Sequence, residues 1–323
     1  MKRWFDRTFE TGLPASEAPR LLERLRAAPD RLASQLDAMP RAIRIYKPDG
    51  RWSVQEHAGH LLDLEDLWAS RLDDFEQARQ VLHPADLQNR RTHDARHNDR
   101  DPRDLIAAFR TARTAIVDRL AGWSPAELSR VSRHPRLDQT MSVVDFCFFV
   151  AEHDDHHLSA AAGIAEAAAA MPACAIDLAN AVDRALPGLR ALGDDGSGRR
   201  PAPGKWSPRE IIGHLIDSAS NNHQRFVRGQ LAGGQDFPRY DQEGWVRVQG
   251  YQSARWADLI DLWRAYNTHL LHVARRMTAE GRRATCRVGG GSEVTLEWLF
   301  TDYVDHLEHH LRAMLGRWEA TGG

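Results

Sequence analysis

The feature that most constrains this chain of 323 residues is an internal repeat. Residues 51–63 (RWSVQEHAGHLLD) match residues 205–217 (KWSPREIIGHLID) at seven of thirteen positions, at an offset of 154. The same offset relates the two DLI triplets at 104–106 and 258–260, and an offset of 153 relates HDDHHL at 153–158 to HLEHHL at 306–311. Three blocks in one order indicate duplication. We therefore expect one domain over residues 1–168 and a second over residues 172–323.

Both halves have the periodicity of helices, because apolar residues recur every three or four positions over long segments. Pro29 and Pro187 lie inside the first helix of each half and are expected to kink or split it. The Gly- and Pro-rich stretch 193–204 is expected to be a mobile connection. The predicted helices cover residues 17–38, 53–78, 103–121 and 142–166, then 176–192, 207–231, 255–279 and 295–318. The predicted fold is all-α, with two tandem four-helix bundles.

The start of the second helix in each half carries a capping motif. Ser53 precedes Glu56 by three residues, and Ser207 stands in the same relation to Glu210. In such a box the hydroxyl accepts from a free backbone N–H while the glutamate reaches back to the cap. We therefore assign both glutamates a structural role.

Histidine carries the strongest chemical signal. His153 and His157 are four residues apart on a predicted helix, as are His306 and His310, so each pair lies on one helix face. A third imidazole comes from another helix: His60 in the first half and His214 in the second. The alternative is a set of core histidines, but it weakens because the same three positions recur in both halves. We predict two metal sites, with His156 and His309 as alternative ligands or as residues that orient the ligands.

Three imidazoles without a thiolate resemble open catalytic metal sites more than closed structural ones. The open position would take water or a thiol and lower its pKa. Imidazole suits zinc, nickel, copper and iron; we expect zinc, with nickel, iron and manganese as other divalent options.

Carboxylates near the histidines have several interpretations. Asp63 and Asp217 follow His60 and His214 by three residues, so each either orients a ligand, accepts a proton as a catalytic group, or is a surface carboxylate. Asp154 and Glu308 lie one and two residues after the first histidine of each pair, and are expected to point away from the site into solvent. The polar stretch that holds His93 and His97 is either the mouth of a pocket or a solvated loop.

Composition excludes several classes of function. The formal charge of −2 provides no basic field for nucleic acid. No apolar run approaches the length of a membrane span, so we expect no membrane association and a cytoplasmic protein. The three cysteines are widely spaced and form no CxxC pair, which fits reduced thiols.

The pattern WSxxExxGHLxD, followed about ninety residues later by HxxHHL, resembles the DinB/YfiT-like superfamily of metal-binding four-helix proteins, in tandem. The second half, with PGKWSPREIIGHLIDS, YDQEGWVR and DYVDHLEHHL, is similar to the branch of bacillithiol transferases and proteins described as metal-dependent hydrolases. The first half, with GHLLDLEDLW and FFVAEHDDHHL, resembles a sister branch. The resemblance implies an up-down-down-up bundle, a divalent metal on three histidines per half, and halves paired as an intramolecular pseudo-dimer, with further homo-oligomers as an option.

The resemblance also implies transfer of low-molecular-weight thiols to electrophiles. Our leading hypothesis is therefore a metalloenzyme that activates such a thiol for S-transfer to an electrophilic small molecule, with Asp63 or Asp217 as proton acceptor. A second hypothesis is a hydrolase that activates water and needs no thiol. An iron-dependent oxygen-using enzyme and a metal-binding module without turnover are further alternatives.

Overall fold

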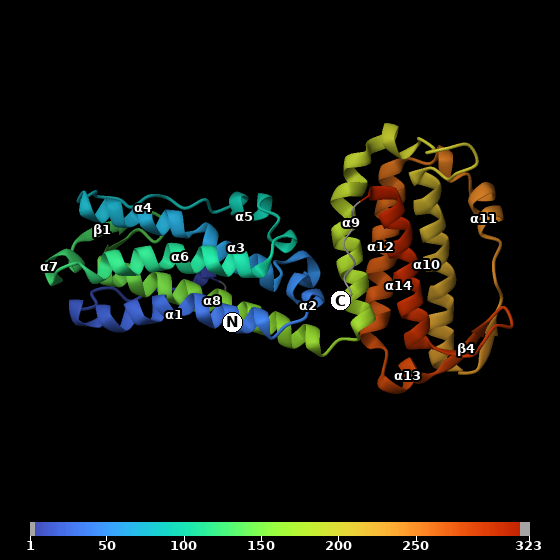
Figure 1. Cartoon of the computed structure of the whole chain (residues 1–323), viewed down its shortest axis with the longest axis horizontal. Coiled ribbons are helices and arrows are strands. Elements are labelled where there is room, and N and C mark those ends of the chain that lie inside the picture. Colours follow the sequence, from blue (N-terminus) through green and yellow to red (C-terminus); the bar gives the residue numbers. More distant parts are fainter. Residues whose placement is uncertain (1–3, 317–323) are drawn as a thin grey trace. The chain divides into compact units, whose positions relative to one another are not determined.

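The computed structural model describes residues 4–316, and the chain divides into two compact units between Ala168 and Ala169 (Figure 1). Helices dominate both units, as the apolar periodicity predicts. Within the described residues, no helix is long and apolar enough to cross a membrane. The expected pairing of the halves as a pseudo-dimer remains a prediction.

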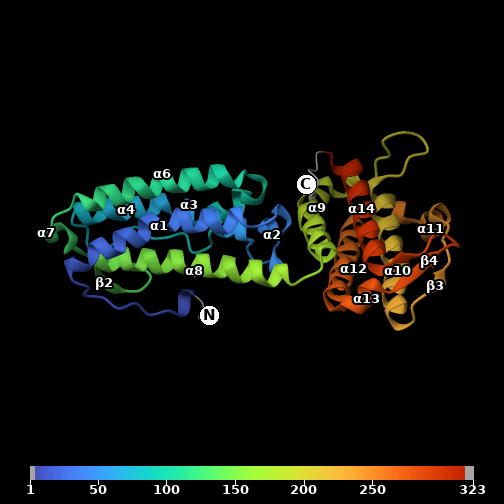
Figure 2. The same cartoon turned by 60° about the horizontal axis from the view of Figure 1, so that its bottom comes forward.

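The first unit is a four-helix bundle whose second helix has two parts (Figure 2). Its long helices are α1 (Ala18–Asp37), α3 (Val54–Asp63) followed by α4 (Glu65–Glu76), α6 (Pro102–Ala121) and α8 (Val143–Ala169). Shorter helices are α2 (Arg41–Ile45), α5 (Arg90–Asp94) and α7 (Pro125–Leu128), with 3₁₀ turns at Trp4–Asp6, Ala15–Glu17, Pro48–Gly50 and His97–Asp99. The single helix predicted over 53–78 is thus divided at Leu64 and ends at Glu76.

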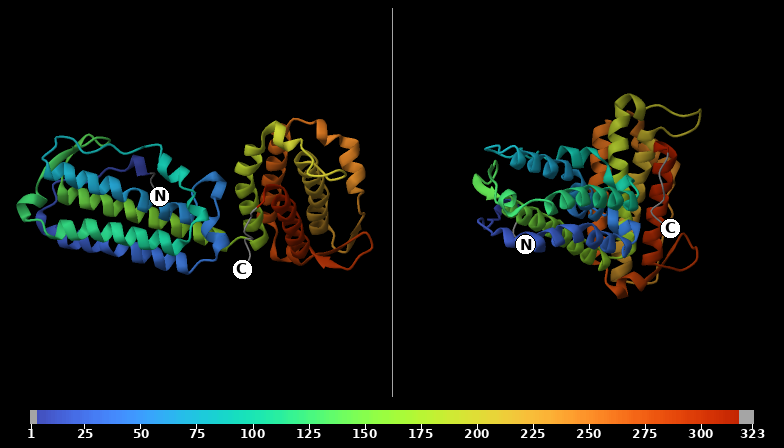
Figure 3. Two further views of the ribbon diagram at one scale, coloured as in Figure 1. Left: turned by 45° about the horizontal axis from the view of Figure 1, so that its top comes forward. Right: turned by 60° about the vertical axis from the view of Figure 1, so that its left-hand side comes forward.

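The second unit repeats the bundle, and its second helix is a single continuous one (Figure 3). The long helices of this unit are α9 (Ala173–Ser197), α10 (Pro208–Leu231), α12 (Trp256–Arg276) and α14 (Leu296–Leu315). Helices α9 and α10 each pack against both α12 and α14. The connections contain α11 (Gln242–Gln249), α13 (Ala279–Arg283) and a 3₁₀ turn at Tyr251–Ser253.

Short strands, which the sequence analysis did not predict, precede the last helix of each bundle. In the first unit, β1 (Val131–His134) pairs antiparallel with β2 (Gln139–Ser142), and Val131 lies opposite Ser142. In the second, β4 (Thr285–Val288) pairs parallel with β3 (Gln235–Phe237) and antiparallel with β5 (Val294–Thr295). Strands β2 and β5 lead directly into α8 and α14, so they fix where these two helices begin.

Proline splits the first helix of neither half, although the sequence analysis expected a kink or a split. Helix α1 is continuous through Pro29, which lacks the N–H that the carbonyl of Leu25 would otherwise accept. The guanidinium of Arg113 donates to that carbonyl at 3.2 Å and replaces the lost helix bond. Helix α9 also runs through Pro187, and its one non-helical residue is Gly193, at φ 60° and ψ −174°. Residues 193–197, expected in a mobile loop, are therefore the last part of α9.

The two cores differ in one layer. Buried apolar residues of the second unit form one cluster, whereas those of the first unit form two. Between the two clusters lie the buried charged side chains of Glu65, Arg113 and Asp154, from α4, α6 and α8. At the corresponding offsets the second unit has Asn267 in place of Arg113 and Leu307 in place of Asp154. This charged layer therefore has no counterpart at those two positions of the second bundle.

Candidate metal centres

The first centre joins His60 on α3 to His153 and His157 on α8. One ring nitrogen from each of the three lies within 4.8 Å of the other two. The Nε2 atoms of His153 and His157 are 3.2 Å apart, and all three side chains are buried. The four-residue spacing on α8 brings the pair to one face, as predicted.

Local structure fixes the position of His60. The capping box at Ser53 and Glu56 is complete, with the hydroxyl accepting from the N–H of Glu56 and the carboxylate accepting from the N–H of Ser53. Helix α3 therefore starts at a defined residue, and His60 lies on its second turn. The structural role expected for Glu56 agrees with this geometry, and Lys47 also donates to its carboxylate.

Burial keeps these imidazoles neutral. It lowers the pKa of His60 to about 3 and the pKa values of His153 and His157 well below the usual range, and the neighbouring imidazoles lower them further. Neutral imidazole has the lone pair that a metal ion needs. The chemistry of the donor set therefore fits a divalent cation.

Asp63 acts on His60 through Thr92. The Thr92 hydroxyl donates to Asp63 at 2.9 Å and lies 3.0 Å from Nδ1 of His60. Because that hydroxyl donates to the carboxylate, it accepts from Nδ1–H of His60, and Nε2 of His60 keeps its lone pair. His97 also donates to Asp63, at 2.8 Å. Burial opposes ionisation of Asp63, but the bonds from His97 and Thr92 lower its pKa.

A fourth imidazole supports His157. Nδ1 of His57 lies 2.8 Å from Nδ1 of His157, so a hydrogen bond between them leaves Nε2 of His157 free for a metal. Burial lowers the pKa of His57 to about 4. Ile211 replaces this histidine in the second unit.

Tryptophans enclose the first centre. The ring of Trp4 packs edge-on against His153, with centroids 4.9 Å apart, and also contacts His156. Trp52 contacts His60 and His157 at 4.6 and 6.0 Å. The first centre is therefore closed on at least two sides by large rings.

The second centre joins His214 on α10 to His306 and His310 on α14. Their ligand atoms also lie within 4.8 Å of one another, and Nε2 of His214 is 3.2 Å from Nε2 of His306. Burial lowers the pKa of His214 to about 3 and that of His310 to about 4, with the adjacent imidazoles adding to the effect. Unlike their counterparts, His306 and His310 are only half-buried.

Asp217 has different partners from Asp63. One of its oxygens accepts from the Tyr251 hydroxyl and from the Gln249 amide, both at 2.7 Å. Its Oδ2, like Nδ1 of His214, is buried and has no hydrogen-bond partner among residues 4–316. Burial raises the pKa of Asp217. Val246 stands at the offset of Thr92, so this position offers no hydroxyl to link the carboxylate to the histidine.

His97 and Tyr251 are supporting residues that the sequence analysis missed. They are 154 residues apart, the offset of the repeat, and each donates to the aspartate of its own unit. A Cβ added at Gly59 or Gly213 would come within 2.1 Å of the His97 or Tyr251 ring. The repeated glycine before His60 and His214 therefore makes room for these rings. Its presence in both halves was a signal in the sequence that another group packs closely at this position. The interpretation of His97 as part of a solvated loop is wrong, because its side chain is fully buried.

The alternative ligands do not join the clusters. His156 contacts Trp4, and His309 is exposed. Neither belongs to a group of ligand atoms close enough to share an ion among the described residues.

The exposure expected for Asp154 and Glu308 is wrong. Both are buried: Arg113 of α6 lies against Asp154, and α14, which carries Glu308, packs against α9 and α10. Asp154 shares Arg113 with Glu65, and Glu308 pairs with Arg312 one turn later. Burial raises the pKa of Asp154 and raises that of Glu65 to about 7, although Arg113 opposes both shifts.

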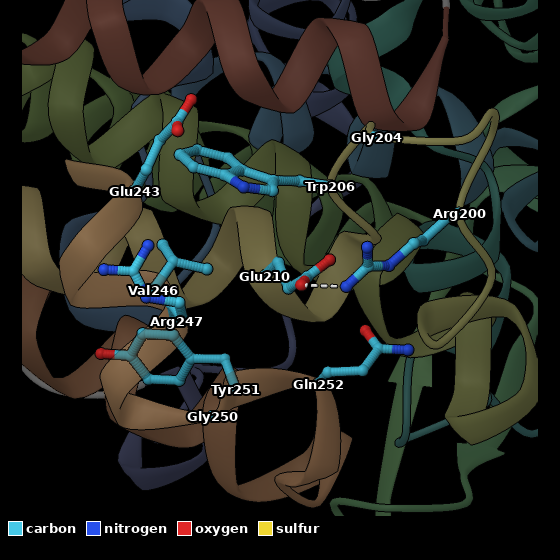
Figure 4. A pocket seen from close by; sticks show the side chains of 10 residues that line it. All are labelled: Arg200, Gly204, Trp206, Glu210, Glu243, Val246, Arg247, Gly250, Tyr251 and Gln252. Atoms are coloured by element: carbon cyan, nitrogen blue, oxygen red, sulfur yellow. Dashed lines mark hydrogen bonds and ion pairs between the residues drawn. The ribbon is translucent and has the colours of Figure 1, made fainter.

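A cavity of about 420 Å³ adjoins the second centre (Figure 4). Trp206 and Tyr251 line it, and they also contact the centre: the Trp206 ring lies 5.1 Å from the His214 ring, and Tyr251 bonds Asp217. The other lining residues come from the segment after α9, the start of α10, α11 and the turn that follows α11. Its volume is in the range of small-molecule sites.

Comparison with known proteins shows the family of the chain. A sequence model described as the DinB superfamily matches residues 18–161 and 178–314. A solved structure with a similar fold is YfiT from Bacillus subtilis, described as a probable metal-dependent hydrolase with an unusual four-helix bundle topology. It is 14% identical, covers 50% of this chain and 94% of its own, and has a TM-score of 0.46. The search of curated proteins found no match.

Proposed function

The chain belongs to the DinB superfamily, duplicated in tandem, and from this premise we propose that its second unit transfers a low-molecular-weight thiol to an electrophilic small molecule. His214, His306 and His310 would hold a divalent metal ion, with zinc as the expected ion. When bound, the ion supplies a Lewis acid that lowers the pKa of a thiol. The observation that carries the assignment is the partial exposure of His306 and His310, which leaves one side of this centre accessible.

The residues around the second centre suit a proton-transfer role. Asp217 is held by Tyr251 and Gln249 through one oxygen, and the other oxygen has no partner among the described residues. We assign that oxygen as the acceptor of the thiol proton. The sulfur then forms a bond to the electrophilic carbon while the bond to the leaving group breaks. The leaving group departs with the electron pair, and the proton passes from Asp217 to that group where it is basic, or to water where it leaves as a stable anion such as chloride.

The first centre is assigned a different role. Trp4 and Trp52 pack against its histidines, and its ligands are all buried. These contacts support a closed metal site that stabilises the first bundle and has no turnover. The two three-histidine centres therefore have different functions.

The test is formation of a thioether from glutathione and 1-chloro-2,4-dinitrobenzene by the zinc-loaded chain. We expect turnover in the wild type and in His153→Ala, and loss of turnover in His306→Ala. Equal loss in both variants would show that the first centre also takes part. Product formation without any thiol would identify a hydrolase instead, and no turnover with glutathione, L-cysteine or water would overturn the proposal.

A further inference from the structure

We propose that the cavity beside the second centre binds the α-amino acid group of the thiol co-substrate, with Arg247 holding its carboxylate and Glu243 its ammonium group. This inference rests on the proposed function, because it names the chemical class of the thiol. It rests on which of the charged residues lining the cavity already have a partner in the protein and which do not.

Some charged groups of the cavity are already engaged. Glu210 accepts from Arg200 and from the N–H of Ser207, and the dashed line in Figure 4 marks its contact with Arg200. Lys47 and Glu56 form the same contact in the first unit. Because both units have it, this ion pair belongs to the helix cap and leaves neither charge for a ligand.

Glu243 and Arg247 are not engaged. They lie one turn apart on α11 and both line the cavity, yet neither forms an ion pair or a side-chain hydrogen bond with any residue in 4–316. Glutamate and arginine at this spacing commonly pair with each other on a helix. An unneutralised anion and cation on one wall complement a ligand that carries both charges at neighbouring atoms. The ammonium and carboxylate groups of an α-amino acid meet that requirement.

The position of the cavity connects this ligand to the second centre. Trp206, whose ring lies 5.1 Å from that of His214, and Tyr251, which bonds Asp217, are part of its wall. A ligand held by Glu243 and Arg247 therefore lies against two residues that contact the centre. We place the sulfur-bearing end of an extended thiol on the side of the cavity formed by these two residues.

The first unit provides an internal control. At the offset of 154, Asn89 and His93 stand where the second unit has Glu243 and Arg247. The first unit therefore lacks the pair of opposite charges. A substitution at His93 should not change binding of an amino acid group.

The experiment is calorimetric titration of the full chain with S-methylglutathione, whose γ-glutamyl end keeps both charges while its sulfur is blocked. We expect binding with and without zinc, weakened about tenfold or more by either Arg247→Gln or Glu243→Gln. His93→Gln should bind as the wild type does. An analogue without the γ-glutamyl amino group should bind more weakly to the wild type and should be insensitive to Glu243→Gln.

The outcomes separate this inference from the proposed function. Absence of binding, or equal affinity in wild type and both cavity variants, would overturn the amino acid site even if thiol transfer occurred. Binding that depends on Arg247 and Glu243 in a protein without thiol turnover would support the site and overturn the proposed reaction. Circular dichroism of each variant would show that a loss of affinity is not a loss of fold.

Discussion

His97 and Tyr251 occupy equivalent positions in the two units, since each packs against the glycine before a candidate ligand and donates to an aspartate three residues after it. In both bundles the aspartate is therefore supported from the same position, but the side chain at that position differs. An imidazole and a threonine hydroxyl hold Asp63, whereas a phenol and an amide hold Asp217. The two centres share a ligand geometry but differ in what surrounds it.

Metal content should follow the two clusters. The zinc-reconstituted wild type should retain about two equivalents per chain, one for each three-histidine group. His153→Ala and His306→Ala should each retain about one, because two imidazoles hold an ion more weakly than three. Elemental analysis after extensive dialysis measures this directly. A wild type that keeps no metal would contradict the assignment of both centres.

The two centres should release metal at different rates. Trp4 packs against His153, while His306 and His310 are half-buried, so a chelator should reach the second centre first. Zinc release to a coloured chelator should be biphasic. Trp4→Ala should accelerate only the slow phase, and Trp298→Ala, an exposed residue on α14, serves as a surface control. Acceleration of neither phase by Trp4→Ala would mean that this ring does not restrict access.

The Thr92 hydroxyl should increase metal affinity at the first centre. Thr92→Val removes the link between His60 and Asp63 and reproduces Val246 of the second unit. Loss of such a ligand-orienting bond typically costs 10–100-fold in affinity. Competition titration in a His306→Ala background isolates the first centre, and Thr92→Ser should restore most of the affinity. Unchanged affinity in Thr92→Val would rule out an orienting role.

The charged layer of the first bundle should make stability depend on pH. Burial raises the pKa of Glu65 to about 7 in the fold, above its usual 4.5, although Arg113 opposes the shift. A raised pKa of an acid means that its contribution to stability is complete below the unfolded pKa and is lost as pH rises through the folded one. Between pH 5 and pH 8 the free energy of unfolding of the metal-free wild type should fall by roughly 2 kcal/mol more than that of Glu65→Gln.

Arg113 should matter more than either of its partners. Arg113→Met leaves two buried carboxylates without a cation and removes the donor to the Leu25 carbonyl, so it should cost about 3–5 kcal/mol. Glu65→Gln leaves one cation and one anion and should cost far less. Urea unfolding of both variants at pH 7 gives the comparison. Equal costs would show that charge balance in this layer is not what stabilises the bundle.

Much of the architecture could be predicted from local patterns. The repeat located the duplication, the three-and-four periodicity located the long helices, and the capping motifs placed the starts of α3 and α10 at Ser53 and Ser207. The four-residue spacing predicted that His153 and His157 share a face. These properties depend on residues within a few helical turns of one another, so they can be predicted from the sequence.

The sequence by itself determined the duplicated bundles of long helices and the six histidines that come together in two groups of three. Only the tertiary structure decided what surrounds them: that Thr92 links Asp63 to His60, that Trp4 covers the first centre, and that Asp154 is buried against Arg113. These contacts join residues from different helices and loops. Their geometry depends on how the elements pack, and periodicity along one helix carries no information about which side chain arrives from another.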